Sequence, residues 1–404
     1  MVATPAWLLD LTRLLSRLGR GPLTGIDRVE LAYLQYLLTR REPLLCLVRT
    51  ALGFVLLDRE GAGGILDRVT GAMPLGQADL LAKLTQRHLP QNARAEADVR
   101  RLAVARAVPL RLGAMLRKWL PMGTVYLNVG HSNLTSHGLR RIKAATGGQV
   151  WVMVHDTIPL DYPQLCRAGT KQGFARKLAA VSAQADLALH TAICTKEQTE
   201  VHLARSGRVP RGIVAALGSN PVAADAPGFG QDRRPYFVAL GTIEPRKNLG
   251  LLVRVWRELQ KSGSPVPHLF VVGNRGWDRP AVFADLQALA KDGVVTLQHD
   301  LGDASVAALL RGAEALLFPS LAEGFGLPPL EAAALGVPVL SGKLPVVVET
   351  LQDYPVYLDT SDVYAWVTAI NQQMTHRTQG HVADRQIRVP PSWADHFEQV
   401  FGTA

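Results

Sequence analysis

The second half of the chain alternates short apolar runs with helical patterns, and this alternation restricts the folds that it can adopt. Beyond residue 234 the predicted strands are Tyr236–Leu240, His268–Val272, Val294–Gln298, Ala315–Phe318 and Pro338–Leu340. Predicted helices follow, beginning near Leu249, Pro280, Ala304 and Pro329. Apolar strands without period-2 polarity, separated by helices, are typical of a buried parallel sheet. The second half is therefore predicted to be an α/β domain.

The first half has the same character with less regular spacing. Its predicted strands are Trp7–Leu11, Leu44–Thr50, Phe54–Leu57, Val125–Val129, Val150–His155, Leu187–Thr191 and Ile213–Leu217, and its clearest helices are Ile26–Thr39 and Lys171–Gln184. A chain of 404 residues exceeds one ordinary core, so two α/β domains are expected. We place them at 1–220 and 236–389, with a Pro- and Gly-rich linker at 221–235 and a helix in 390–404 expected to pack back on the first domain.

The cysteines and the apolar runs indicate the compartment that we expect. Cys46, Cys166 and Cys194 are far apart, with neither CxxC spacing nor a disulfide framework, which fits a reducing cytoplasm. Residues 1–10 lack the pattern of a signal peptide, and no run reaches the roughly 20 apolar residues of a membrane span. The sequence predicts a cytoplasmic protein, either free or peripheral at the inner face of the cell membrane. Its oligomeric state is left open.

The charge is distributed unevenly along the chain. Residues 1–230 carry 29 Lys and Arg against 16 Asp and Glu, whereas the remainder carries 15 against 18. In residues 83–120, nine basic side chains accompany only Glu96 and Asp98. This stretch is either a solvated helical face or a surface for anionic lipid headgroups or a phosphate-bearing acceptor. No recognised nucleic-acid motif accompanies the charge, so no nucleic-acid partner is expected.

A loop with two adjacent cations follows the first strand of the second domain. It reads Gly241-Thr-Ile-Glu-Pro-Arg246-Lys247-Asn248 and leads into a helix. The loop lies at the carboxyl edge of the predicted sheet, where ligands bind in open α/β folds. Two cations near a helix N-terminus form a favourable phosphate site, although an isolated pair is more often an ordinary basic turn.

A second loop carries two glutamates eight residues apart. Phe318-Pro-Ser-Leu-Ala-Glu323-Gly-Phe-Gly-Leu-Pro-Pro-Leu-Glu331 follows another predicted strand. Its glycines allow backbone N–H groups to approach a ligand closely. Carboxylates are good acceptors for vicinal hydroxyls, so one glutamate can hold a ribose and the other a hexose. The alternative for Glu331 is an ordinary surface position on the helix.

Together, in this order and spacing, the two loops resemble the retaining GT-B glycosyltransferases of glycosyltransferase family 4, many of which assemble bacterial polysaccharides and lipid-linked glycans. The GxxxxRKN loop and the EX7E motif are matched in full, and the resemblance covers residues 235–342. It implies two facing Rossmann-like domains with a cleft between them. It further implies transfer of a hexose from a GDP- or UDP-linked sugar to a glycan or lipid-linked acceptor, with retention of configuration.

The resemblance also implies roles for individual residues. Arg246 and Lys247 would neutralise the donor diphosphate and stabilise the leaving group, Glu323 would contact the sugar, and Glu331 would bind the ribose. The expected catalytic residues are therefore Arg246, Lys247, Glu323 and His155. Further donor-binding positions, besides Glu331, are expected at Gly241, Asn248, Gly273, Asn274, Leu301, Gly324, Phe325, Gly326 and Leu327.

In the first domain the resemblance is weaker. His155 and Asp156 end a buried strand at the place of the family's His/Asp motif, although a buried histidine or a turn-capping aspartate is the ordinary alternative. Thr24-Gly25-Ile26-Asp27-Arg28 resembles the family's Gly-rich loop, with Thr24 and Asp27 in place of two glycines. Candidate acceptor-side residues are Gly25, Asp27, Arg28, His131 and Asp156. A polar cluster of Asn128, His131, Ser132 and Asn133 follows a strand as well.

In the implied mechanism the leaving phosphate takes the acceptor proton, so no pair of carboxylates at glycosidase spacing is needed. The sequence contains no DxD pair, and we expect no metal and no cofactor apart from the nucleotide-sugar donor. Three alternatives remain. They are a non-catalytic nucleotide-sugar-binding protein, a GT-B epimerase or hydrolase, and a dinucleotide enzyme, for which Gly324-Phe-Gly326 lacks the third glycine of GxGxxG.

Overall fold

A computed structural model describes residues 6–18, 23, 25–85, 90–219, 234–263, 265–378 and 387–402. The chain divides into two compact units, each described here by itself. The first comprises residues 1–155, 172–190 and 196–214, and the second comprises 156–171, 191–195 and 215–404. The predicted linker, 221–235, lies outside the described residues except for Arg234 and Pro235.

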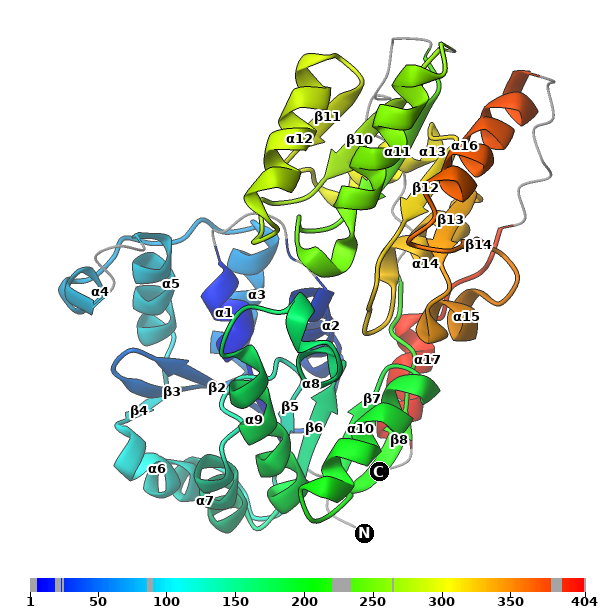
Figure 1. The fold of residues 1–404 in the computed structure, drawn as a ribbon. Coiled ribbons are helices and arrows are strands. Elements are labelled where there is room, and N and C mark those ends of the chain that lie inside the picture. Colours follow the sequence, from blue (N-terminus) through cyan, green and yellow to red (C-terminus); the bar gives the residue numbers. More distant parts are fainter. Residues whose placement is uncertain are drawn as a thin grey trace. The chain divides into compact units, whose positions relative to one another are not determined.

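The first unit is built on an eight-stranded sheet in the order β4-β3-β2-β1-β5-β6-β7-β8 (Figure 1). Its strands are β1 Trp7–Asp10, β2 Leu44–Thr50, β3 Gly53–Leu57, β4 Ala105–Ala107, β5 Val125–Asn128, β6 Val150–Val154, β7 Leu187–His190 and β8 Arg211–Val214. Strand β3 pairs antiparallel with both neighbours, and the remaining pairs are parallel. Across the sheet the strand numbers fall from β4 to β1 and then rise from β5 to β8. The loops after β1 and β5 therefore meet at a topological switch point.

The helices around this sheet connect its strands. They are α1 Thr12–Arg17, α2 Gly25–Thr39, α3 Arg59–Thr70, α4 Leu80–Thr85, α5 Pro90–Arg101, the 3-10 turn η1 Pro109–Arg111, α6 Leu112–Trp119, α7 Ser136–Thr146, α9 Thr170–Gln184 and α10 Ile193–Arg205. The first residues of α9 and α10 are assigned to the second unit. Helix α7 begins where the Thr135 hydroxyl accepts the Gly138 N–H, and it ends at Gly147, which has φ +62°.

The second unit contains a six-stranded, fully parallel sheet in the order β11-β10-β9-β12-β13-β14. Its strands are β9 Tyr236–Leu240, β10 His268–Val272, β11 Val295–Gln298, β12 Ala315–Phe318, β13 Val339–Gly342 and β14 Val356–Leu358. Numbered from β9, this is the 3-2-1-4-5-6 order of doubly wound dinucleotide-binding sheets. The switch point lies between β9 and β12.

Helices cover both faces of the second sheet. They are α11 Leu249–Lys261, α12 Pro280–Lys291, α13 Asp303–Arg311, α14 Leu327–Ala334, α15 Pro345–Leu351 and α16 Val363–Thr378. Residues of β9 alternate between two cores, since Phe237 packs with α11, α12 and α16, while Val238 packs with α13 and α14. This unit also contains α8 Ile158–Asp161, the turns η2 Pro163–Leu165 and η3 Pro245–Lys247, and α17 Trp393–Phe401.

The C-terminal helix α17 begins with a capping box formed by Ser392 and Asp395. His396 Nδ1 lies 3.0 Å from the carbonyl oxygen of Ala216, and the Ser219 N–H donates to the Pro391 carbonyl over 3.0 Å. These contacts attach α17 to residues 216–219 within the second unit. Packing of residues 390–404 on the first domain stays a prediction.

The sequence placed most strands within a residue or two of their observed ends, with one clear error. The strand predicted at Ile213–Leu217 is β8, Arg211–Val214. Its extent follows from its partner, because β8 pairs residue for residue with the four residues of β7, starting at Leu187↔Arg211. The three-residue edge strands β4 and β14 were not predicted. No helix within the described ranges is long and apolar enough to cross a membrane.

Candidate active site

The two predicted motif loops of the second unit meet at its switch point. Strands β9 and β12 are neighbours, and the loop after each carries the motif residues. The Leu321 N–H donates to the Arg246 carbonyl over 2.7 Å, which ties the second loop to the first. The sequence separates these loops by about 80 residues, and the sheet order alone brings them together.

Four charged side chains form an ion-pair cluster at this point, comprising Glu244, Arg246, Lys247 and Glu323. Glu323 Oε2 lies 2.5 Å from Arg246 Nη1, and its Oε1 lies 2.6 Å from Lys247 Nζ. Arg246 Nε also pairs with Glu244. Only 8% of the Glu323 side chain and 9% of the Lys247 side chain are exposed, so the pairs lie largely out of water. One carboxylate therefore orients both cations.

The cluster shifts the pKa values of its members in different directions. Burial alone would raise the pKa of Glu323, but Arg246 and Lys247 outweigh it and lower the pKa to about 2. Burial lowers the pKa of Lys247 despite the opposing effect of Glu323. Burial also raises the pKa of Glu244, against the two neighbouring cations. Glu323 is therefore firmly ionised at neutral pH and supplies the charge that stabilises the pair of cations.

The guanidinium of Arg246 keeps one edge available. Its Nε and Nη1 atoms contact Glu244 and Glu323, and Nη1 also lies 3.4 Å from the Ala322 carbonyl. Across the described residues, Nη2 has no hydrogen-bond partner. A fixed guanidinium with a free N–H edge beside a lysine is suited to an anion such as a diphosphate.

Glycines allow close approach in the strand-end loops. Gly241 has φ +133°, and a Cβ there would lie 2.7 Å from Cε of Lys247. A Cβ at Gly273, which has φ +152°, would collide with the Gly241 carbonyl oxygen. Both positions therefore require glycine, the first because φ +133° strains any residue with a Cβ and the second because two backbones touch.

The second glutamate lies on α14, which begins after a tight turn. Gly326 has φ +88° and precedes Leu327, the first residue of the helix. Phe325 is buried and Glu331, in the helix, is half-buried. The Gly324–Gly326 loop and the start of α14 thus occupy the same sheet edge as the ion-pair cluster. The predicted roles of Gly324, Phe325, Gly326, Leu327 and Glu331 in donor binding stay predictions.

The remaining predicted donor positions have clear structural roles as well. Asn248 adopts φ +51° before α11, and its Nδ2 donates to the Thr360 carbonyl over 3.2 Å. The Asn274 carbonyl accepts the Ile243 N–H over 3.0 Å, which joins the loops after β9 and β10. Leu301 packs beside the core under α13. Contact of these residues with a nucleotide stays a prediction.

The first unit has a polar network at its own switch point. Asp10 ends β1 and accepts hydrogen bonds from the Tyr126 hydroxyl over 2.8 Å and from Asn133 Nδ2 over 2.7 Å. Asn128 Nδ2 donates to the Tyr126 oxygen over 2.9 Å, while the buried Asn128 Oδ1 has no partner among the described residues. His131 and Asn133 adopt φ of +60° and +55°. Non-glycine residues held in this region are frequent at functional sites.

Two histidines of the predicted site lie beside this network. The His131 and His155 rings are 5.0 Å apart, and each ring bonds to a backbone carbonyl, His131 to Met153 over 2.8 Å and His155 to Val129 over 2.6 Å. Burial, with His155 nearby, holds the pKa of His131 well below its usual value. His131 is therefore neutral at physiological pH.

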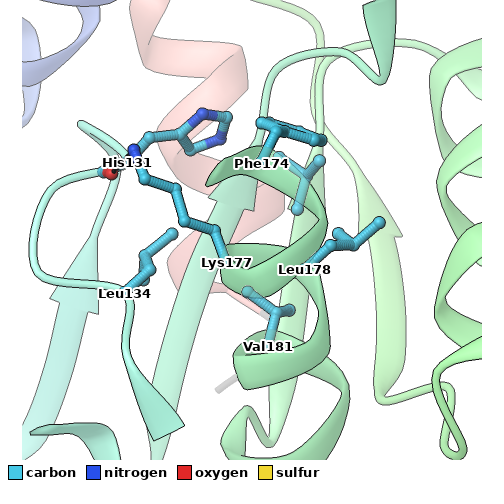
Figure 2. Close-up of a pocket in the computed structure, with 7 residues that line it drawn as sticks. His131, Leu134, Phe174, Lys177, Leu178 and Val181 are labelled. Atoms are coloured by element: carbon cyan, nitrogen blue, oxygen red, sulfur yellow. Dashed lines mark hydrogen bonds between the residues drawn. The ribbon is translucent and has the colours of Figure 1, made fainter. Parts of the chain in front are cut away.

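Figure 2 shows His131 facing Phe174 and Lys177 of α9 across a small pocket. The His131 and Phe174 rings are 5.9 Å apart, and Lys177 Nζ donates to the His131 carbonyl over 2.8 Å. At about 10 Å³ the cavity holds about one water molecule. It is too small for a sugar, and the Lys177 hydrogen bond ties the His131 loop to α9.

The predicted glycine-rich loop differs from phosphate-binding loops because it contains a buried, paired carboxylate, Asp27. Thr24 lies outside the described residues, and Gly25 begins α2 with φ +26°. Asp27 is fully buried and pairs with Arg13 over 2.8 Å and with Arg17 over 3.3 Å. This carboxylate stabilises α1 against α2. An acceptor role for Gly25, Asp27 and the half-buried Arg28 stays a prediction.

Sequence reasoning missed a second buried carboxylate on α2. Glu30 accepts the Leu14 N–H over 2.5 Å through Oε2, and its Oε1 has no partner in the described part of the chain. Burial raises its pKa well above the usual value. The available signal was that Asp27 and Glu30, three residues apart, lie on one face of a predicted helix. Two acidic residues on one helical face are equally typical of a solvent-exposed face, so the sequence did not indicate that Glu30 is buried.

The predicted pair His155–Asp156 is divided between the two units, with Asp156 in the second. There the Asp156 Oδ1 accepts the Ile158 N–H over 3.1 Å, as an aspartate capping a turn does. Burial raises its pKa while the Arg246 charge opposes that shift. Asp156 therefore combines a local turn role with an electrostatic interaction with the cation cluster.

Within the described ranges no three His, Cys, Asp or Glu side chains are grouped so as to hold a metal ion. Metal independence stays a prediction.

Comparison with known proteins identifies the second half of the chain. Residues 225–387 match the family described as "Glycosyl transferases group 1". Serotype-specific mannosyltransferase WbdA of Escherichia coli is 28% identical over 232 residues, covering 53% of this chain and 28% of that protein. O-antigen chain mannosyltransferase RfbU of Salmonella typhimurium is 31% identical over 143 residues, covering 35% and 38%. This chain therefore spans less than two fifths of the length of either relative.

Among solved structures, HepE of Anabaena in complex with UDP and glucose matches 99% of both chains with a TM-score of 0.65 and 12% identity. At this identity the likeness concerns the fold. It confirms the predicted fold class, a GT-B arrangement of two Rossmann-like α/β units. The family match over residues 225–387 includes both motif loops and agrees with the family expected from them, while retention of configuration stays a prediction. Residues 225–387 therefore match glycosyl transferases group 1, and the fold of the chain is that of GT-B glycosyltransferases.

Proposed function

We propose that the protein is a cytoplasmic glycosyltransferase that moves a hexose from a GDP- or UDP-linked sugar to a glycan or lipid-linked acceptor in polysaccharide assembly. The carrying observation is the pairing of Arg246 and Lys247 with one buried carboxylate at the switch point of the second sheet. A preorganised pair of cations at a strand-end loop is suited to a diphosphate leaving group. The group 1 domain over the same residues supports this reading.

We infer a retaining reaction without a metal. The bond between the sugar C1 and the β-phosphate oxygen breaks, and a bond forms between C1 and the acceptor oxygen on the same face. The acceptor proton passes to the departing phosphate. Arg246, through its Nη2 edge, and Lys247 would stabilise the charge that develops on that phosphate. Glu323 would hold both cations and contact the sugar.

The identity of the transferred sugar is inferred from the relatives. Two relatives are named mannosyltransferases, which favours mannose, whereas the structural neighbour holds UDP and glucose. The acceptor would bind the network of Asp10, Asn133 and His131 in the first unit. That network combines a switch-point position with strained backbone and a buried amide oxygen, Asn128 Oδ1, that has no partner among the described residues.

Thermal stabilisation by nucleotides tests the donor site directly. The wild type is melted with GDP, UDP, GDP-mannose and UDP-glucose, with and without EDTA, beside Arg246→Ala, Glu331→Ala and the exposed control Arg254→Ala. We expect one base to raise Tm in the wild type and control, with or without EDTA, and to lose its effect in both site variants. A shift that survives Arg246→Ala would refute the cation site, and a shift lost in EDTA would refute metal independence.

Product analysis separates transfer from the alternative activities. The donor that stabilises the protein is incubated with and without lipid-linked and free glycan acceptors, and the sugar is followed. Transfer that requires acceptor supports the proposal. Free sugar or an epimerised nucleotide sugar formed without acceptor would indicate a hydrolase or an epimerase, and binding without turnover would indicate a non-catalytic protein.

A further inference from the structure

A long stretch of the first unit contains no acidic residue. Between Asp98 and Asp156 the sequence has nine Lys and Arg and neither Asp nor Glu. This stretch contains β4, η1, α6, β5, α7 and β6. Its positive charge must therefore be neutralised by acids from elsewhere in the chain or remain available to a partner.

The structure divides the basic residues into two groups. Arg100 pairs with Asp79 over 2.6 Å, Arg101 with Asp98 over 2.6 Å, and Lys143 with Asp186 over 2.5 Å. These ion pairs neutralise two of the three basic side chains of α5 and one of the three of α7. Arg100 and Arg101 of α5 are thus neutralised within the unit, with Arg100 buried, and are not available to a partner.

The second group lies on η1 and α6 and lacks acidic partners. Arg111, Arg117 and Lys118 are exposed, and none of them has an acidic partner in the part of the chain that the structure describes. Arg140, on the neighbouring helix α7, is also exposed and has no acidic partner among the described residues. Exposed cations without counter-charges attract an anionic partner.

Exposed apolar side chains accompany these cations. Leu110 is 82% exposed, Met122 is 77% exposed and Trp119 is 41% exposed. Leu110 lies in the 3-10 turn η1 directly before α6, and Arg117, Lys118 and Trp119 are the last three residues of α6. The opposite face of α6 is buried through Leu112, Met115 and Leu116.

Helix α7 fixes this surface from behind. Arg141 Nη1 donates to the Pro109 carbonyl over 2.9 Å, and a Cβ at Gly147 would collide with Met122, which places Met122 against the end of α7. Figure 1 shows α6 and α7 side by side. The η1–α6 surface, defined by Leu110, Arg111, Arg117, Lys118, Trp119 and Met122, is therefore held in place at both ends.

We propose that the η1–α6 surface docks the protein on an anionic lipid bilayer. Cations would lie at the headgroups while Leu110, Trp119 and Met122 reach the acyl boundary, the arrangement of interfacial amphipathic helices. A nucleic acid would satisfy the cations but would leave exposed Leu and Met side chains without a partner. The exposed basic and apolar side chains of the 110–122 segment together thus favour lipid.

Vesicle sedimentation of the full chain, without any nucleotide, tests the docking surface. Vesicles of phosphatidylcholine alone and of equal parts phosphatidylcholine and phosphatidylglycerol are compared at low and moderate salt. Two double variants are used, Arg117→Glu/Lys118→Glu and Leu110→Ser/Met122→Ser. Matched controls on the second unit are Arg254→Glu/Lys291→Glu for charge and Tyr364→Ser/Val389→Ser for exposed apolar area.

We expect binding to the anionic vesicles only, weakened by salt and lowered by more than roughly tenfold in the charge variant. The apolar variant should also bind at least roughly fivefold more weakly, and both controls should bind like the wild type. Equal binding of the charge variant and its control would overturn the proposal. Dependence on charge but not on Leu110 and Met122 would overturn insertion, and selective binding of an RNA oligonucleotide would assign the surface to nucleic acid.

The thermal shift with nucleotides distinguishes this outcome from failure of the proposed function. Both η1–α6 variants should retain the Tm increase of the wild type with its preferred nucleotide. Loss of vesicle binding with an intact nucleotide response would show that the two properties are separate.

Discussion

At the scale of single residues, the donor-site candidates depend on one carboxylate. Glu323 is buried and contacts both motif cations, Arg246 over 2.5 Å and Lys247 over 2.6 Å. The residue types and their order were evident in the sequence. Direct pairing of Glu323 with the cations was not, because it depends on the adjacency of β9 and β12. Sequence reasoning assigned Glu323 to a sugar, and the structure adds a role in holding the cations.

The Glu323→Gln variant should change how stability depends on pH. The folded pKa of about 2 lies below the ordinary value of 4.5, so ionised Glu323 stabilises the fold above pH 4.5 and this contribution is lost as pH falls toward 2. We expect the variant to be about 3 kcal/mol less stable at pH 7, with a flatter loss of stability below pH 4.5. Urea unfolding at several pH values measures this.

Exposed Glu398→Gln is the control for loss of a carboxylate, and its curve should follow the wild type. Parallel pH curves for wild type and Glu323→Gln would contradict the proposed stabilisation by the two cations.

At the scale of elements, the loop after β9 is shaped by close packing over a glycine. Lys247 passes over Gly241, where a Cβ would lie 2.7 Å from Cε of the lysine. The resemblance of the sequence predicted Gly241 only as a donor-binding position. The structure shows that this glycine admits a neighbouring side chain of the same loop, which only the folded conformation of η3 reveals.

Gly241→Ala should therefore impair nucleotide binding and also lower the free energy of unfolding, because φ +133° strains a residue with a Cβ. Displacement of Lys247 removes one charged hydrogen bond to the diphosphate, so we expect affinity to fall by about tenfold or more. Calorimetric titration with the preferred nucleotide measures the change.

The matched control is Gly250→Ala in the first turn of α11, where a Cβ would make only ordinary contacts at 3.6 Å. It should leave affinity unchanged and raise the free energy of unfolding by up to about 1 kcal/mol. Equal affinity of wild type and Gly241→Ala would show that Lys247 does not depend on this packing.

Short edge strands show why element prediction was incomplete. The sequence predicted the central strands β9, β10 and β12 at their observed bounds, because they are apolar and buried on both faces. Strands β4 and β14 contain three residues each and pair at sheet edges, so neither length nor periodicity identifies them. The placement of β8 failed for a related reason, since its length is determined by β7.

For the whole molecule, the buried histidines determine stability in mild acid. Burial lowers the pKa of His396 to about 4 and that of His190 to about 4. The unfolded chain takes up these protons near pH 6.5 and the folded chain only near pH 4, so stability is lost as pH falls between these values. None of this could be read from the sequence, which does not show which histidines are enclosed.

His396→Asn should flatten that dependence. The substitution removes one group whose protonation costs about 3 kcal/mol of stability between pH 6.5 and 4. The variant is less stable than the wild type at pH 7, because the hydrogen bond to the Ala216 carbonyl changes. Urea unfolding from pH 7 to pH 4 measures the slope. Exposed His137→Asn should keep the wild-type slope, and an unchanged slope in His396→Asn would contradict neutral burial of this side chain.

The placement of the motif residues on separate strand-end loops has a consequence for engineering. The ion-pair cluster uses the loops after β9 and β12, whereas Asn274 lies in the loop after β10, joined to them through its backbone carbonyl. Because a backbone bond survives a change of side chain, position 274 can be randomised without rebuilding the cations. A library at this position would vary the surroundings of a donor while preserving the machinery proposed for the leaving group, so that recognition and reactivity can be selected independently.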